Sequence, residues 1–202
     1  LMEECGRELA MAPFFTTCGL AAPLILAAAD ADQQAALLPR IAEGAAAAVC
    51  LSEDGVALRG GPGDWRLDGE APYVAYGHAA EFLIVVAKGP GDGVSLIAIE
   101  VSAPGMTITR RTSVDLTRPY GAVRFDNARV ADDQVLGAPG QARLAVERGL
   151  AVAQAMLAAE QVGAAEMCLE ATRDYVAQRV QFGRPVGSFQ AVKHRLADMA
   201  MQ

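Results

Sequence analysis

Residues 173–199 read RDYVAQRVQFGRPVGSFQAVKHRLADM, and they indicate how the rest of the chain is organised. Their apolar spacing predicts two amphipathic helices that meet at a tight turn. Gly183 and Pro185 are expected to end the first helix, because glycine accepts a left-handed φ and proline has no amide hydrogen to donate. Ser188 can cap the second helix through its side-chain oxygen. The expected apolar stripes are Leu169, Tyr175, Val176 and Val180 before the turn and Phe189, Val192, Leu196 and Met199 after it.

The turn also carries Arg179, Gln181 and Gln190, polar side chains that a plain helical hairpin does not need. Its spacing resembles the acyl-CoA dehydrogenase family, in which R-x-x-F-G-x-P-[IV]-x-x-[FH]-Q joins two helices of the C-terminal four-helix domain. So many fixed positions in one short segment make the match specific. The matching residues are Arg179, Phe182, Gly183, Pro185, Val186, Phe189 and Gln190.

This resemblance implies both a cofactor and a binding site. In the family the arginine and its neighbours hold the FAD of the adjacent subunit, chiefly at its diphosphate and adenine side. Guanidinium forks suit phosphate oxygens, and amides suit a neutral heteroaromatic ring. The resemblance therefore implies that Arg179, Gln181, Phe182 and Gln190 bind FAD. For any one of them, the alternative is a helix–turn–helix with a solvated side chain, which the combination disfavours.

The resemblance covers nearly all of the 202 residues and implies an α+β fold. Residues 1–45 would end an N-terminal helical domain, residues 46–139 would form a middle domain with an antiparallel β-barrel or sandwich, and residues 140–202 would begin a C-terminal helical bundle. The family's L-P-x-[IL]-A-x-G run before the sheet is matched from Leu38 to Gly44. Because the chain starts abruptly at Leu1 and stops at Gln202 without a cap, we expect it to be truncated relative to the family.

Proline and aspartate delimit the helices that the first residues predict. Residues 1–12 read as the end of a helix that Pro13 breaks. Residues 19–29 read as an alanine- and leucine-rich helix. Asp30 or Asp32 is expected to cap a short helix over residues 33–38, which Pro39 closes.

From residue 45 to about residue 137, short β-rich runs alternate with Gly, Pro and Asp clusters, which is typical of an antiparallel barrel or sandwich. The glycine turns at residues 60–63 and 88–93 lack the strand before and helix after that a phosphate-binding loop requires, so a Rossmann or P-loop fold is excluded. The candidate strands are residues 46–51, 65–68, 82–87, 94–100, 106–109 and 122–125, with residues 129–130 closing a hairpin.

A long helical pattern then covers residues 141–180. Gly163 lies inside it and is expected to permit close helix packing. The expected core residues of this helix are Leu144, Leu150, Val152, Met156, Leu157, Val162 and Met167.

The family's middle domain supplies two further flavin contacts, which the resemblance places on this chain. Its Y-x-[VIL]-[TS]-E segment aligns with residues 49–53, so Leu51 would contribute its backbone and Ser52 a hydroxyl. Its W-[IV]-[TS] segment aligns with residues 73–75, so Tyr73 would lay a ring against the isoalloxazine. Ala75 lacks the hydroxyl that is expected to bond the flavin edge. An ordinary strand-end serine and an ordinary sheet tyrosine are the alternatives for Ser52 and Tyr73.

At other positions this chain lacks the functional side chains that the family has there. After Glu53, residues 54–56 replace the glycine-rich loop whose serine contacts the acyl-CoA. Helix positions that are charged in the family align with the uncharged residues 151–154, among them Ala153, where some members carry the catalytic glutamate. Removing the α-proton of a thioester needs a positioned base, while FAD takes the β-hydrogen as hydride. No catalytic residue is therefore predicted here, and the base is expected beyond Gln202 or in a partner.

Two functions stay open. The first is an acyl-CoA dehydrogenase that desaturates an acyl-CoA at its α,β bond with FAD, passes electrons to an electron-transfer flavoprotein, and forms homo- or hetero-oligomers. The second is a non-catalytic or half-site subunit whose turn completes the FAD site of a partner acyl-CoA dehydrogenase subunit. A flavin monooxygenase or oxidase on the same fold is a third, weaker option. The isolated 202 residues are expected not to retain FAD.

Composition argues against several other classes. The net charge is −7 and no basic cluster is present, which argues against nucleic acid or an anionic membrane surface as partner. The longest apolar runs are too short to span a bilayer, and the acidic start lacks the basic region of a signal peptide. Cys5, Cys18, Cys50 and Cys168 are scattered, which predicts reduced, mostly buried thiols in a cytoplasmic protein. The two histidines lie on different predicted elements, so no metal site is predicted.

Overall fold

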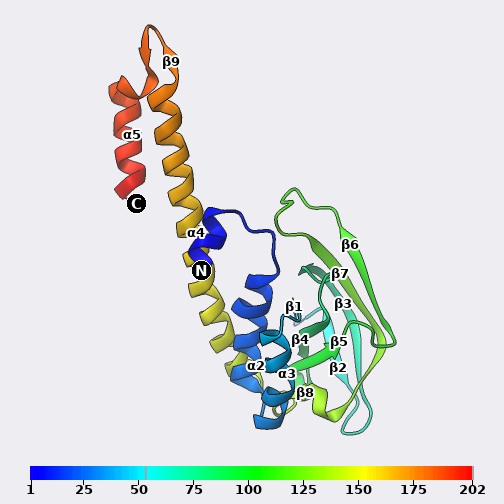
Figure 1. Cartoon of the computed structure of the whole chain (residues 1–202). Coiled ribbons are helices and arrows are strands. Elements are labelled where there is room, and N and C mark those ends of the chain that lie inside the picture. Colours follow the sequence, from blue (N-terminus) through cyan, green and yellow to red (C-terminus); the bar gives the residue numbers. More distant parts are fainter. Residues whose placement is uncertain (53, 202) are drawn as a thin grey trace. The chain divides into compact units, whose positions relative to one another are not determined.

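A computed structural model describes residues 1–52 and 54–201 of the chain. Glu53, which belongs to the predicted flavin segment, and Gln202 lie outside the described residues. The chain divides into two compact units, one formed by Met11–Met156 and the other by Leu1–Ala10 together with Leu157–Gln202. Helices and one large sheet make up the predicted α+β fold (Figure 1). The division into three domains stays a prediction.

The larger unit contains an eight-stranded sheet with the order β6-β7-β3-β2-β4-β5-β8, in which β1 also pairs with β4. Most neighbouring strands are antiparallel. The predicted antiparallel middle domain also contains two parallel pairings, because β1 and β2 both run parallel to β4. The strands are β1 Ala47–Leu51, β2 Val56–Arg59, β3 Trp65–Ala75, β4 Phe82–Lys88, β5 Val94–Glu100, β6 Met106–Arg111, β7 Tyr120–Val130 and β8 Val135–Leu136.

Two strands are much longer than the sequence predicts. β3 runs through Gly69 and Pro72, which read as strand breakers, and β7 joins the predicted runs 122–125 and 129–130. The two strands pair with each other through two register shifts, one next to each breaker. Such bulges take up a glycine or a proline without ending the strand. Residues 129–130 therefore end β7 and do not close a separate hairpin, and the short strands β2 and β8 add to the predicted set.

A helical segment with two geometries precedes the sheet. η1 is a π-helix at Phe15–Ala21, and it continues directly into α2 at Ala22–Ala28. The predicted helix of residues 19–29 therefore begins earlier than expected. The hydroxyl of Thr17 ties the π-helix to β1, because it donates to the carbonyl of Ala47 and accepts from the same residue's N–H, both at 3.0 Å.

Asp30, one of the two predicted caps, begins the next helix, α3 at Ala31–Ala42, which is longer than the predicted helix of residues 33–38. Its carboxylate accepts the N–H of Gln33 at 2.8 Å, and the Gln33 side chain accepts the N–H of Asp30 at 3.1 Å, which completes a capping box. The expectation that Pro39 closes the helix is wrong. A proline removes one amide donor, and the helix runs past it because Glu43 N–H still donates to the Pro39 carbonyl at 2.9 Å.

The sheet is buried on both faces where β1, β4 and β5 pair. Along β4, Leu83 and Val85 belong to one apolar cluster and Ile84 and Val86 to another, since successive side chains point to opposite faces. The second cluster includes Leu24 of α2, so the helices that precede β1 cover that face (Figure 1).

In the smaller unit, helix α1 at Met2–Arg7 crosses the second part of the long helix α4, Arg143–Gln178. A Cβ at Gly6 would lie 1.8 Å from the carbonyl oxygen of Glu160, and a Cβ at Gly163 would lie 1.8 Å from that of Glu3. Both glycines are needed for this approach of the two backbones, which confirms the packing role predicted for Gly163. The first helix ends at Arg7, well before Pro13, where the sequence placed its end.

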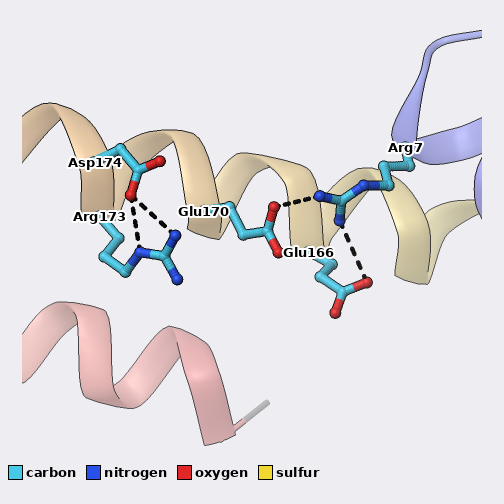
Figure 2. Close-up of polar contacts among 5 residues, drawn as sticks. All are labelled: Arg7, Glu166, Glu170, Arg173 and Asp174. Carbon is cyan, nitrogen blue, oxygen red and sulfur yellow. Dashed lines mark hydrogen bonds and ion pairs between the residues drawn. The ribbon is translucent and has the colours of Figure 1, made fainter.

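Charged side chains hold α1 on α4 (Figure 2). Arg7 donates from Nη2 to Glu170, and its Nη1 lies 3.7 Å from Glu166, so that one cation of α1 contacts two carboxylates of α4. The hydrogen bond to Glu170 raises the pKa of Arg7. One turn further along α4, Arg173 pairs with Asp174 of the same helix at 2.9 Å.

Small residues are the most buried ones in the first half of α4, which corrects the predicted core in part. Ala153 is 4% exposed, and a Cβ at Gly149 would come within 2.6 Å of the Leu24 side chain. Small side chains let a helix approach its neighbours closely. Leu150, one of the predicted core residues, is partly buried against the same apolar cluster. Four predicted core residues are exposed, namely Leu144, Val152, Val162 and Met167.

None of the helices in the described ranges is long and apolar enough to cross a membrane.

Candidate functional site

A short β-hairpin, not a plain turn, joins the two last helices (Figure 1). The expectation that Gly183 and Pro185 end the first helix is therefore wrong, because α4 already ends at Gln178 and the intervening residues pair as strands. The elements that follow α4 are β9 Val180–Gln181, β10 Arg184–Pro185, the 3-10 turn η4 Val186–Ser188 and α5 Gln190–Met201.

The backbone fixes Arg179 at the base of this hairpin. Its N–H donates to the carbonyl of Tyr175 at 2.8 Å, and its own carbonyl accepts the N–H of Val186 at 2.7 Å. Arg179 is exposed, and its guanidinium makes no hydrogen bond or ion pair with any residue that the structure describes. The nearby Arg173 and Arg184 both have partners. Arg179 thus offers a charged fork on a fixed backbone to a ligand.

Phe182 lies at the tip of the hairpin. It adopts a left-handed φ of 54°, is followed by Gly183 at 75°, and its side chain is 93% exposed. Its ring meets that of Phe189 edge to face at 6.2 Å between centroids, and the guanidinium carbon of Arg184 lies 4.0 Å from the Phe189 centroid. A left-handed conformation costs a non-glycine residue about 1–2 kcal/mol. The hairpin therefore holds Phe182, with its exposed ring, in a backbone conformation that other contacts must stabilise.

The other polar side chains of the hairpin have local contacts. Gln181 Nε2 donates to the carbonyl of the preceding residue at 2.7 Å, and Gln190 Nε2 lies 3.5 Å from His194 Nε2. The expectation that Ser188 caps the second helix is wrong, because its Oγ is buried and has no hydrogen-bond partner among the described residues. The helix instead begins one residue later than a serine cap requires, so Phe189 stands at the capping position.

The charge around the hairpin is positive in a chain whose net charge is −7. Residues 175–197 contain Arg179, Arg184, Lys193 and Arg195 and no aspartate or glutamate. This local excess of positive charge favours an anionic ligand.

A second group of predicted residues lies where β1 ends, in the larger unit. Leu51 is its last residue and is 51% exposed. Ser52 Oγ donates to the carbonyl of Glu70 at 3.3 Å, and its carbonyl accepts the N–H of Gly55 at 3.0 Å. A Cβ at Gly55 would lie 2.2 Å from Ser52 Oγ, so the turn needs glycine to come this close to β3. Glu53, the remaining residue of the predicted segment, lies outside the described residues.

Tyr73 lies on the outer face of β3. Val74 beside it is fully buried, so Tyr73 and Ala75 point away from the core. Tyr73 is 75% exposed, and its ring meets that of Tyr120 edge to face at 6.5 Å between centroids. The structure thus brings the predicted residues together in two groups, Leu51, Ser52 and Tyr73 in one compact unit and Arg179, Gln181, Phe182 and Gln190 in the other.

The positions that the sequence leaves without catalytic chemistry are also uncharged and in part inaccessible. Ala153 is buried in the apolar cluster that contains Leu24, while Ala151 and Gln154 are exposed. Among the described residues, no three or more His, Cys, Asp or Glu side chains gather in a way that would hold a metal ion.

The cysteines are free, and they differ in exposure. The expectation of mostly buried thiols is wrong in part, because Cys50 is buried, Cys5 and Cys18 are partly buried and Cys168 is exposed. Burial raises the pKa of Cys50 to about 12. Cys168 lies on α4, on the solvent side of that helix.

We expect Cys168 to react with iodoacetamide at pH 8 at least about tenfold faster than Cys50, because the thiolate is the reactive form and burial keeps Cys50 protonated. The measurement is timed alkylation followed by peptide mass spectrometry. In urea, where both thiols are exposed, the two rates should converge. Equal rates in the folded protein would contradict the burial of Cys50.

Two contacts of the site are not predicted by the sequence patterns. They are the stacking of Arg184 on Phe189 and the edge-to-face contact of Tyr120 with Tyr73. The sequence does contain a signal for the second, because Tyr120 is an aromatic residue just before the predicted strand at residues 122–125, and aromatic residues favour strands.

Sequence comparison matches residues 142–202 to the family described as acyl-CoA dehydrogenase, C-terminal domain. The chain is 31% identical over 203 residues to acyl-CoA dehydrogenase FadE28 of Mycobacterium tuberculosis, covering 98% of this chain and 57% of that protein. It is 34% identical to acyl-CoA dehydrogenase IpdE2 of the same organism, covering 98% of this chain and 50% of the relative. The chain spans about half the length of the curated relatives it matches.

Solved structures give the same picture. A structure named Tcur3481-Tcur3483 steroid ACAD superposes with a TM-score of 0.85 at 34% identity, over 100% of this chain and 55% of that one. Butyryl-CoA dehydrogenase from Megasphaera elsdenii superposes with a TM-score of 0.90 at 25% identity, over 99% of this chain and 57% of that one.

Proposed function

This chain belongs to the acyl-CoA dehydrogenase family, and from this membership we propose that it serves the FAD-dependent α,β-desaturation of an acyl-CoA thioester. Electrons would pass on to an electron-transfer flavoprotein. The protein would work as a homo- or hetero-oligomer, as the family resemblance implies for a hairpin that holds the FAD of an adjacent subunit.

The observation that carries the proposal is the state of Arg179. Its backbone is fixed by two hydrogen bonds, yet its exposed guanidinium has no partner among the described residues. Guanidinium binds phosphate oxygens with two parallel hydrogen bonds and keeps its charge at any physiological pH. The diphosphate of FAD is the group that this cation fits.

The neighbouring residues fit the rest of the cofactor. Phe182 offers an exposed ring for the adenine, and Gln181 and Gln190 have amides suited to its edge. On the larger unit, the Ser52 hydroxyl donates to Glu70 and its oxygen can still accept a hydrogen bond from the isoalloxazine, while Tyr73 offers an exposed ring. One position fits less well, since Ala75 has no hydroxyl for the flavin edge.

Bound FAD would supply the acceptor for the hydride that leaves the β-carbon of the thioester while a carboxylate takes the α-proton. The chain's own residues would bind and orient the cofactor. None of the described residues is assigned as the base, because the position of Ala153 is occupied by a small side chain buried among apolar ones.

The same observation favours a second candidate, a half-site subunit that completes the FAD site of a partner acyl-CoA dehydrogenase. The hairpin with its available Arg179 is suited to cofactor binding, whereas residues 151–154 carry no charge.

The test is the flavin content of the protein that contains this chain, purified alone and after co-expression with a paralogous acyl-CoA dehydrogenase subunit. Bleaching by acyl-CoAs under anaerobic conditions follows, with a panel that includes a steroid-bearing acyl-CoA. FAD and bleaching in the lone protein would support the dehydrogenase. FAD and bleaching only with the partner would support the half-site subunit, and absence of FAD from both preparations would overturn both candidates.

A further inference from the structure

The outer face of the sheet has a second aromatic residue beside Tyr73. Tyr120 is the first residue of β7, and it is paired directly with Ala75 of β3 on one side and with Arg111 of β6 on the other. Directly opposite residues of an antiparallel pair project on the same face of the sheet, with Cβ atoms about 4.5–5.5 Å apart. The side chain of Tyr120 therefore projects from the face on which Ala75 lacks a hydroxyl.

The contact between the two rings supports this direction. The rings of Tyr73 and Tyr120 are inclined by 85° with their centroids 6.5 Å apart, an edge-to-face arrangement that leaves a face of Tyr73 open. Tyr120 itself is half-buried, whereas Tyr73 is 75% exposed, and the backbone of Tyr120 is paired with strands on both sides.

The phenol of Tyr120 is available to a ligand. No other residue that the structure describes forms a hydrogen bond with it. Tyr76 directly follows β3, and its hydroxyl is already used within the fold. It donates to the carbonyl of Thr117 at 2.6 Å and so anchors the segment that leads into β7. Of these two tyrosines, Tyr120 is the one whose hydroxyl can donate a hydrogen bond to a ligand.

We propose that Tyr120 is a further FAD-binding residue, whose hydroxyl donates a hydrogen bond to the edge of the flavin ring in place of the hydroxyl absent at Ala75, while its ring braces Tyr73. This inference rests on the proposed function, because it requires that the face of β3 around Tyr73 receives a flavin. A tyrosine hydroxyl lies further from its strand than a threonine hydroxyl does. Tyr120 can therefore reach, from the neighbouring strand, the place that a hydroxyl at position 75 would occupy.

The test uses the FAD-loaded protein, or its FAD-loaded complex if a partner is needed, and compares Tyr120→Phe with the wild type. Phenylalanine keeps the ring contact and removes only the hydroxyl. We expect the dissociation constant for FAD, measured by quenching of flavin fluorescence, to rise about three- to tenfold, the effect of one neutral hydrogen bond. The long-wavelength flavin absorption band should shift as well, which a purely structural role of the hydroxyl would not cause.

A second variant restores the hydroxyl at the other strand. Tyr120→Phe combined with Ala75→Thr should return the dissociation constant to within about twofold of the wild type, because threonine suits a strand and offers a hydroxyl on the same face. Tyr175→Phe is the matched control, since this exposed tyrosine lies on α4 outside the sheet.

The outcomes separate this inference from the proposed function. If the wild type binds FAD and Tyr120→Phe binds it equally well with an unchanged spectrum, the role of Tyr120 is refuted and the proposed function stands. A loss that Ala75→Thr does not restore would assign the hydroxyl to folding and refute its place at the flavin edge. If the wild type binds no FAD alone or with a partner, both proposals fall together.

Discussion

Replacing Arg179 with alanine is expected to weaken FAD binding about tenfold to a hundredfold. A hydrogen bond to a charged group contributes about 1.5–3 kcal/mol, and each 1.4 kcal/mol changes a dissociation constant tenfold. Arg179 has no partner among the described residues, so its removal leaves no buried group unpaired in the free protein. The loss would therefore appear in cofactor binding and not in stability. Flavin fluorescence titration measures the binding, and the urea midpoint measures the stability.

Two variants make this experiment specific. Arg179→Lys keeps the charge but not the planar fork, so it should recover only part of the affinity. Arg195→Ala removes the same charge from an exposed position on α5 and should change the dissociation constant by less than about threefold, since screening weakens exposed charges. If Arg179→Ala binds FAD as tightly as the wild type, the hairpin is not the site of the diphosphate.

Replacing Gly69 with alanine should lower the free energy of unfolding of the larger unit by about 3–5 kcal/mol. Gly69 has a φ of 125°, which an alanine adopts only with strain, and a Cβ there would lie 2.1 Å from the carbonyl oxygen of Gly55. That oxygen accepts the N–H of Glu70 at 2.8 Å, so the clash breaks a contact between β3 and the turn that leads into β2. Ser52, which donates to Glu70, would lose its position at the same time.

Two other glycines of the same unit distinguish the effect of the strained φ from the effect of the steric clash. Gly61→Ala meets no atom within 4 Å at an ordinary φ, so it should change the free energy of unfolding by less than about 0.5 kcal/mol. Gly63→Ala has open space but a φ of 83°, so it should cost about 1–2 kcal/mol. Urea denaturation monitored by the fluorescence of Trp65 gives all three values. Equal costs at Gly63 and Gly69 would show that the close approach of β2 contributes nothing.

The family and the position of the hairpin could be predicted because their signals are local. Arg179, Phe182 and Gln190 lie close together in the sequence, and between them Gly183 permits a left-handed φ and Pro185 fixes its own φ whatever the rest of the chain does. Asp30 was one of two residues predicted as a helix cap for the same reason, since a capping box involves residues three apart. Ser188 has the same capping chemistry, but its hydroxyl is buried where α5 starts, so local preference was overruled.

The sequence by itself determined the α+β class, most of the strands and the residues of the candidate FAD hairpin, because periodicity and turn chemistry act between near neighbours. Only the tertiary structure decided that β3 continues through Gly69, that α4 buries its small residues, and that Tyr120 lies opposite Ala75. These features depend on residues far apart in the chain, whose pairing register and closeness of approach are set when strands and helices pack together.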